Sequence, residues 1–324
     1  MTDPTVFSAR SRAFTRSQVL SAAEFRSDLA PLRDTIRLGL ACQQHAEDEG
    51  FLIDADALQT EAERYRIERD LSTAEDTERW LADHDVTVED FTAWLERRLW
   101  RDRFASEIAA RPADFHADPD DVEALVWPEV VFGDHLPALS RRLAARVAAL
   151  LECGRSCDAL HWEQELTAME QAYDEVRRLA VAPVQVGREL EARRALLMRF
   201  DAETAVFASL DAAREAWLCA THDDEPLETV AARVGASYGR AGQFLDEFPE
   251  QLQPRILSAS LGEILPPVEH GDGFLVCRVC AKSLPDSAGD PAVRARIEAA
   301  LVDRAVDDLL RKHITLVQRD AAAG

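Results

Sequence analysis

The spacing of apolar residues constrains the fold of this 324-residue chain more than any other feature. From Phe14 to Glu49, and in later stretches as far as Leu179, apolar side chains recur every three or four residues, the spacing of one helix face. After Arg194 the pattern changes to short runs rich in β-branched and aromatic residues, which are typical of strands. The sequence therefore predicts a predominantly helical α+β protein whose sheet lies in the last third.

Two capping signals place helix starts in the N-terminal part. Ser72 is followed three residues later by Glu75, and Thr87 by Asp90, and both pairs fit a capping box that satisfies free amides at a helix N-terminus. The helix after Thr87 carries an apolar stripe that we expect to be core, made of Phe91, Trp94, Leu95 and Leu99.

The part after Arg194 alternates strands with helices. Strands are predicted at 205–209 and 274–280, and the helices between them at 211–220, 225–234 and 249–258. Glycines flank a predicted loop at Gly239–Gly242. The expected order is strand, helix, helix, glycine loop, helix and two strands.

A chain of this length exceeds what one small core usually needs, so several folded parts are expected. Four segments follow from the patterns above: a helical N-terminal domain at 1–111, a helical middle region at 112–203, a small α+β domain at 204–285 and a C-terminal helix at 286–324. The residues Ile314–Val317 could add a terminal strand or pack back on the N-terminal helices.

Charge narrows the expected partners. The chain has 60 acidic and 37 basic residues and a formal net charge of -23, which repels phosphate backbones and anionic lipid. We therefore expect neither nucleic acid nor a membrane as partner. The start has no apolar segment behind a basic one, and no stretch is long and apolar enough to span a bilayer. These features predict a cytoplasmic protein.

Two motifs that contain cysteine have residue types that could bind a metal. Cys153, Cys157, His161 and Glu165 would share one helix face, but they would span about 18 Å and could not surround one ion, so only a partial or shared site stays open. Cys277 and Cys280 have the spacing of a zinc knuckle or redox motif, yet residues three apart on a strand face opposite ways unless a bulge intervenes. We expect no metal and no cofactor.

The segment 204–285 resembles the second half of parvulin-type prolyl isomerases. The likeness rests on the runs Leu261–Ile264, Pro266–Val268 and Gly273–Val276, because a Gly-Glu-Ile strand precedes a Gly-aromatic-His strand in that family. Upstream, Gly50–Asp56 and Val86–Phe91 with Trp94 and Leu95 resemble the helical N-terminal domain of SurA/PpiC-type chaperones. The resemblance implies a helical chaperone-like domain plus a parvulin-like domain, with the C-terminal helix packing back on the N-terminal domain.

The family's isomerase chemistry uses two histidines that this chain lacks. Ala205 or Val206 occupies the first position and Leu275 the second, so the resemblance implies no catalytic residue here. The apolar proline-holding pocket of the family would fall on six residues, for which the alternative is a plain core role: Tyr238, Phe244, Leu252, Ile256, Phe274 and Leu275.

Three functions remain open at this stage. The first is a non-catalytic, PpiC-related chaperone that holds an extended or precursor peptide during maturation of a ribosomally made peptide. The second is an enzyme, either an active peptidyl-prolyl cis-trans isomerase or one that uses a cysteine nucleophile. The third is a scaffold that joins a peptide to a peptide-modifying enzyme.

The N-terminal part also contains a dense basic run, formed by Arg97, Arg98, Arg101 and Arg103. On an acidic protein this run could receive an acidic peptide segment. The plainer alternative is a solvated helix face paired with Glu96 and Asp102.

Overall fold

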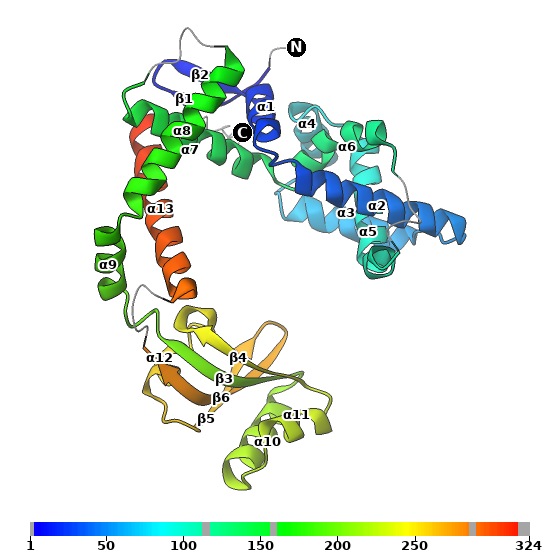
Figure 1. Ribbon diagram of the computed structural model, residues 1–324. Coiled ribbons are helices and arrows are strands. Elements are labelled where there is room, and N and C mark those ends of the chain that lie inside the picture. The colour runs from blue at the N-terminus through cyan, green and yellow to red at the C-terminus, as the bar shows by residue number, and fades with distance from the viewer. Residues whose placement is uncertain (1–2, 112–116, 156–160, 285–289, 317–324) are drawn as a thin grey trace. The chain divides into compact units, whose positions relative to one another are not determined.

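The computed structural model describes residues 3–111, 117–155, 161–284 and 290–316 (Figure 1). The chain divides into two compact units, one made of Met1–Asp174 with Asp308–Gly324 and one made of Glu175–Asp307. The boundaries fall inside helices α8 (Trp162–Ala180) and α13 (Pro291–His313). Unit 2 is therefore one continuous stretch, and unit 1 is built from both ends of the chain. The predicted divisions after residues 111, 203 and 285 stay a prediction.

Unit 1 begins with a small antiparallel sheet of strand order β2-β1-β7, formed by β1 (Thr5–Ala9), β2 (Arg12–Thr15) and β7 (Ile314–Leu316). The helix predicted from about Phe14 begins at Arg16, and the hairpin before it was not predicted. Phe7 and Phe14 lie opposite each other in the hairpin, with stacked rings 4.8 Å apart. The two strands are too short for an alternation of apolar and polar residues to predict them. The terminal strand expected at 314–317 is present through Leu316, while Val317 lies outside the described residues.

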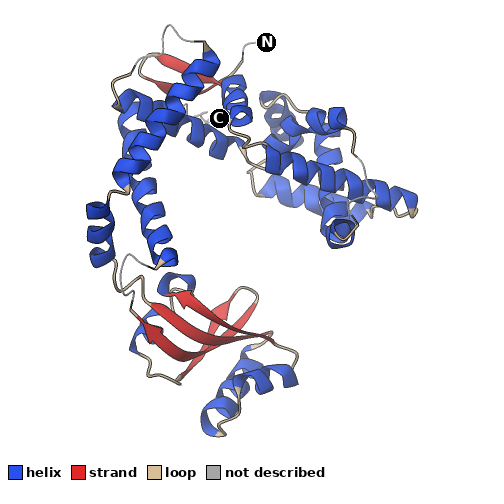
Figure 2. Cartoon of the chain, viewed as in Figure 1, coloured by secondary structure: helices blue, strands red, loops and turns tan. Residues whose placement is uncertain are grey.

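Helices make up the rest of unit 1 (Figure 2). They are α1 (Arg16–Phe25), α2 (Ala30–Asp48), α3 (Ala55–Ile67), α4 (Ala74–Asp83), α5 (Val88–Ala109), α6 (Pro119–Phe132), α7 (Leu136–Glu152), the first part of α8 and the end of α13.

The capping prediction is confirmed at Thr87, whose hydroxyl and amide both bond Asp90. It is wrong by one residue at the other site, since Thr73 and Asp76 form the box instead of Ser72 and Glu75. Pro128 lies inside α6 and does not end it.

Unit 2 contains α9 (Pro183–Ala192), β3 (Arg199–Phe207), α10 (Leu210–His222), α11 (Leu227–Arg233), β4 (Ser237–Phe244), a 3₁₀ turn (Leu245–Glu247), α12 (Gln253–Ser258), β5 (Ile264–His270), β6 (Gly273–Ser283) and most of α13. The four strands form an antiparallel sheet of order β4-β3-β6-β5. The α10 and α11 helices cover one face and α12 covers the other.

The expected glycine loop at Gly239–Gly242 is wrong, because these residues lie within strand β4 and pair with β3. Neither glycine is required by a turn, since neither has a positive φ. A Cβ at 242 would stand 2.7 Å from the Arg199 Nε atom, which belongs to the end of a flexible side chain, and a Cβ at 239 would meet only the Thr204 hydroxyl at 3.9 Å. Both glycines therefore lie on an edge strand without being required there.

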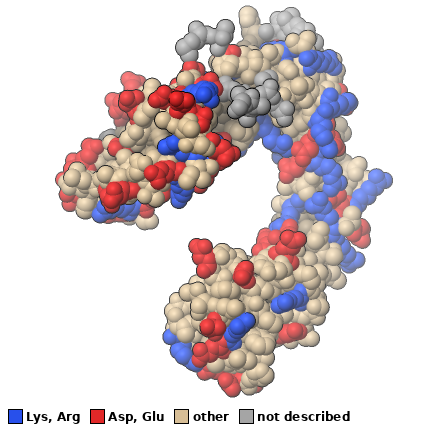
Figure 3. Space-filling view, turned by 180° about the vertical axis from the view of Figure 1, so that it is seen from behind, with Lys and Arg blue, Asp and Glu red and all other residues tan. Residues whose placement is uncertain are grey.

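The predicted fold class, α+β and predominantly helical, is confirmed. Among the described helices, none is long and apolar enough to cross a membrane. Acidic and basic side chains are mixed on the face drawn in Figure 3, as expected for a surface with many local ion pairs.

Candidate functional site

The six residues predicted to bind peptide lie in three separate clusters of unit 2. Leu252, Ile256 and Leu275 pack together beneath α12, and the first two have 0% exposed surface. Tyr238 and Phe274 lie half-buried on the opposite face, against α10 and α11.

Phe244, the sixth residue, packs apart from the other five, with α9 and α13. The guanidinium of Arg296 lies 4.6 Å from the centre of its ring. The structure thus does not gather the six residues into one groove, and peptide binding through them stays a prediction.

The two positions that the parvulin resemblance assigns to histidines lie side by side in the sheet. Val206 on β3 pairs directly with Leu275 on β6, and Ala205 pairs with Val276. Leu275 is 5% exposed and Val206 packs against the same cluster. Neither side chain can donate or accept a hydrogen bond, so this pair cannot stabilise a twisted amide through polar contacts.

The surroundings of the two cysteines of β6 favour the protonated thiol. Burial raises the pKa of the Cys277 thiol to about 12, and burial together with the nearby Glu203 raises that of Cys280. A bulge is present after all, since Asp201 pairs with Ala281 and Ala202 with Val279, which leaves Cys280 unpaired in the ladder. A thiolate nucleophile is disfavoured at both positions.

No metal site is found among the residues that the structure describes. In the motif at 153–165, Cys157 lies outside the described residues. Glu165 is 4% exposed and accepts two bonds from the Arg12 guanidinium, at 2.5 and 2.7 Å. This carboxylate therefore serves to join β2 to α8.

Unit 1 contains an open cleft of about 640 Å³ between helices α2, α3, α5 and α6. Its lining combines aromatic and charged side chains: Pro31, Leu32, Thr35, Tyr65, Glu68, Arg69, Trp94, Arg98, Arg101, Glu129, Phe132, Gly133 and His135. We define this as the aromatic–arginine cleft.

The floor of the cleft belongs to a rigid aromatic cluster. The ring of Tyr65 lies 5.6 Å from Trp94 and 6.2 Å from Phe132, measured between centroids, with both pairs edge to face. Trp94 belongs to the predicted stripe of α5. The stripe residues Phe91, Trp94 and Leu95 are buried as expected, whereas Leu99 is only half-buried. These contacts fix the orientation of the floor.

The basic run of α5 divides between cleft and core. Arg98 lies 5.6 Å from the centre of the Trp94 ring, and Arg101 lies 4.0 Å from Glu129, both lining the cleft. Arg97 is buried beneath them, 3.9 Å from Glu129, and burial lowers its pKa. Arg103 packs over Phe51 instead. The run is therefore not a solvated face throughout.

Two buried donors in this region have no hydrogen-bond partner among the described residues. They are the hydroxyl of Tyr65 and the Nη2 atom of Arg97. Tyr65 is 4% exposed, and burial raises the pKa of its hydroxyl to about 12 despite the guanidinium of Arg69 lying 3.7 Å from the ring centre. Unmade hydrogen bonds of this kind are costly in a folded protein.

A second hollow of about 290 Å³ adjoins the cleft, since Arg69 lines both. Its wall is more apolar and consists of Arg69, Trp80, His84, Val131, Asp134, Leu136 and Pro137. The rings of Trp80 and His84 stack at 4.2 Å, and the Nδ1 atom of His84 lies 2.7 Å from the Trp80 carbonyl oxygen.

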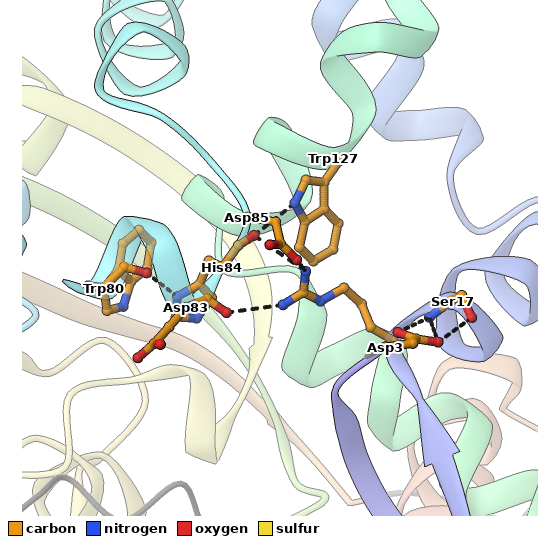
Figure 4. Close-up of polar contacts among 8 residues, drawn as sticks. Asp3, Ser17, Trp80, Asp83, His84, Asp85 and Trp127 are labelled. Atoms are coloured by element: carbon orange, nitrogen blue, oxygen red, sulfur yellow. Dashed lines mark hydrogen bonds and ion pairs between the residues drawn. The ribbon is translucent and has the colours of Figure 1, made fainter. Parts of the chain in front are cut away.

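Arg16 holds this wall in place from the start of α1. Its guanidinium donates to the Asp85 carboxylate at 2.6 Å and to the Asp83 carbonyl at 3.2 Å, and the Trp127 indole donates to the His84 carbonyl at 2.9 Å (Figure 4). The Arg16 guanidinium also lies 4.4 Å from the centre of the Trp127 ring. The last turn of α4, which carries Trp80 and His84, is thereby tied to α1 and α6.

Most cleft residues were missed from the sequence, although one signal for them existed. Leu58, Ala62, Tyr65 and Arg69 follow one another at helical spacing along and just beyond α3. That pattern predicts that one face of the helix is buried. It cannot predict which residues pack against that face, because Arg98 and Phe132 come from distant segments.

No protein-family model and no curated protein matches the sequence. Solved structures align over nearly the whole chain at low identity. The foldase PrsA from Lactococcus lactis is 10% identical with a TM-score of 0.30, covering 97% of this chain and 95% of that one. The PrsA prolyl isomerase from Bacillus cereus is 8% identical with a TM-score of 0.29, covering 100% and 95%. A SurA-like chaperone structure from Campylobacter jejuni is 7% identical with a TM-score of 0.20, covering 98% and 100%. Scores this low carry no argument about function.

Proposed function

We propose that the chain is a peptide-binding chaperone or accessory protein that has no prolyl isomerase activity. The observation that carries the proposal is that Ala205 and Val206, either of which the resemblance to parvulins places at the first histidine position, pair with Val276 and with Leu275, the second position. An apolar pair can hold a peptide's apolar side chain but cannot polarise its amide.

The peptide is bound in an extended form in this proposal. Tyr238 and Phe274 offer partly exposed aromatic surface on the sheet of unit 2, and the aromatic–arginine cleft offers a second surface in unit 1. Aromatic side chains contribute much of the binding energy in peptide recognition because they bury large area at low entropic cost. A cytoplasmic role in maturing a ribosomally made peptide, alongside a peptide-modifying enzyme, belongs to the proposal.

Two alternatives are less well supported by the residues present. An active isomerase would need another source of polar stabilisation near Val206 and Leu275. A cysteine enzyme would need a thiolate, which the raised pKa values of Cys277 and Cys280 oppose.

A titration with a permanently unfolded protein, reduced and carboxymethylated lactalbumin carrying a fluorescent label, tests the proposal. We expect saturable binding that weakens in Tyr238→Ala. Arg240→Gln, an exposed change on the same strand, is the matched control and should bind normally. Absence of saturable binding would exclude the peptide-holding function, whatever the behaviour of the variants.

A further inference from the structure

The aromatic–arginine cleft has a local charge opposite to that of the whole chain. The protein carries a formal net charge of -23, yet this lining includes three arginines, Arg69, Arg98 and Arg101, against two glutamates, Glu68 and Glu129. Glu129 is already engaged by Arg97 and Arg101 at 3.9 and 4.0 Å. Arg98 is left to stack on Trp94, with donors available to a ligand.

The buried donors without hydrogen-bond partners in the described part of the chain favour an anionic ligand, as does the positive local charge. The Tyr65 hydroxyl, on a residue that lines the cleft, makes no hydrogen bond among the described residues, and neither does the Nη2 atom of Arg97, which lies 3.9 Å from the Glu129 carboxylate. A cationic ligand would meet repulsion from the arginines and satisfy neither donor. An anion with several acceptor oxygens suits the Tyr65 hydroxyl and the three arginines that line the cleft.

We propose that the aromatic–arginine cleft binds a carboxylate of the peptide, held by Arg98 and Arg101 with the Tyr65 hydroxyl as a further donor. The adjoining hollow lined by Trp80 and Leu136 takes an apolar side chain next to that carboxylate. The preferred segment is thus one in which acidic and large apolar residues alternate. This inference rests on the proposed peptide-binding function and specifies what the peptide must contain.

The size and walls of the two hollows fit such a segment. The larger one, of about 640 Å³, has the charged rim, and the smaller, of about 290 Å³, has the more apolar wall, with Arg69 between them. Planar guanidinium groups pair with carboxylates through two parallel hydrogen bonds, which gives direction as well as affinity. The aromatic floor lowers the local dielectric and strengthens that pairing.

Fluorescence anisotropy with the full chain tests the inference. The probes are a labelled peptide of alternating Glu and Leu with an amidated end, its counterpart with Gln in place of Glu, and a Gln and Leu peptide with a free C-terminal carboxylate. Binding of the Glu and Leu peptide reports recognition of side-chain carboxylates, and binding of the Gln and Leu peptide with a free C-terminus reports recognition of a terminal carboxylate. We expect the Glu peptide to bind about tenfold more tightly than its amidated Gln counterpart, with the difference shrinking at high salt.

Variants locate the site. Arg98→Gln and Arg101→Gln should each weaken binding of the Glu peptide about tenfold while leaving the Gln peptide unaffected. Tyr65→Phe should weaken it about fivefold and leave folding intact, because the hydroxyl has no partner to lose. Arg79→Gln on α4, an arginine 66% exposed and outside both hollows, is the matched control.

The outcomes separate two failures. If the Glu peptide and its amidated Gln counterpart bind equally and Arg98→Gln has no effect, the carboxylate inference is wrong while the peptide-binding function stands. If neither binds, and the unfolded protein does not bind either, the proposed function fails and takes this inference with it. If only the peptide with a free C-terminus responds to the arginine variants, the cleft reads chain ends and the alternating-acid specificity is refuted.

Discussion

Arg16, the first residue of α1, joins that helix to α6 and to the end of α4, beside the smaller hollow. It is 8% exposed, pairs with Asp85, bonds the Asp83 carbonyl at the end of α4 and stacks on Trp127. A buried guanidinium with this many partners cannot be replaced by an apolar chain without leaving acceptors unpaired.

Arg16→Met is therefore expected to lower the free energy of unfolding of unit 1 by about 2 kcal/mol. The loss of unfolding free energy in Arg16→Lys should be smaller than in Arg16→Met, because an ammonium keeps the charge but not the planar geometry of the guanidinium. Urea denaturation followed by tryptophan fluorescence measures both. Arg37→Met, which breaks an exposed pair with Asp34 on α2, is the control and should change stability by less than about 0.5 kcal/mol. Equal losses in the two Met variants would refute the joining role.

The buried thiol of Cys277 should make the free energy of unfolding fall as the pH becomes alkaline. Burial raises its pKa from the usual 9.0 to about 12, so between these values the unfolded chain loses the proton while the folded chain keeps it. The contribution of the neutral thiol is fully present below pH 9.0 and is lost as pH rises towards 12. We expect Cys277→Ala to be less stable at neutral pH but to lose less stability on going from pH 9 to pH 11. Parallel pH profiles for the two proteins would contradict this.

At the residue scale the sequence predicted what depends on near neighbours. Thr87 with Asp90, and the stripe of Phe91, Trp94 and Leu95, follow from spacing within one helix. The sequence could not predict that Tyr65 meets Phe132, or that Arg12 bonds Glu165, because those contacts join segments that only the tertiary fold brings together.

The closing strand β7 is the element that returns the end of the chain to its beginning within unit 1. Its residues pair with β1, and the helix before it is tied to α7, because Lys312 and His313 contact the Glu152 carboxylate at 2.8 and 2.6 Å. The hydrogen bond from His313, followed by that from Lys312, holds the pKa of Glu152 below its usual value.

Replacing Ile314, Thr315 and Leu316 with glycine should release β1 from this neighbour. Glycine has weak strand propensity and a higher entropic cost of ordering. Hydrogen exchange of the Phe7–Ala9 amides is expected to speed up, while that of α5 stays unchanged. Thr315→Val retains a β-branched residue and is the control. Unchanged exchange in the glycine variant would mean that β7 contributes nothing to the sheet.

Elements were predicted well where the pattern was long and poorly where it was short. Helical spacing located most of unit 1, and the strand at Phe274–Cys280 was found within β6. The hairpin of β1 and β2 and the strand β4 were missed, since Gly239 and Gly242 on an edge strand look like a turn until their cross-strand partners are known.

At the scale of the whole molecule, unit 2 is a continuous stretch with its own hydrophobic clusters. The clusters on the two sheet faces and the one between α9 and α13 are each made of residues from 175–307. A contiguous segment with this much internal packing should fold alone.

The excised fragment 175–307 is therefore expected to give dispersed amide resonances and cooperative thermal unfolding. The matched comparison is 204–285, which lacks α9, α13 and the first strand residues and so loses the cluster around Val186 and Val293. We expect that shorter fragment to be much less stable. A fragment 175–307 without cooperative unfolding would show that the unit depends on the rest of the chain.

The most direct measurement of the central claim is a prolyl isomerisation assay on short peptides, run on the same protein that is titrated with an unfolded substrate. The uncatalysed reaction must cross a barrier of about 20 kcal/mol, and the pair Val206 and Leu275 has no group that lowers it. Saturable binding with no acceleration of isomerisation is the predicted result. Clear acceleration that survives purification would contradict the non-catalytic function and make an isomerase the leading one.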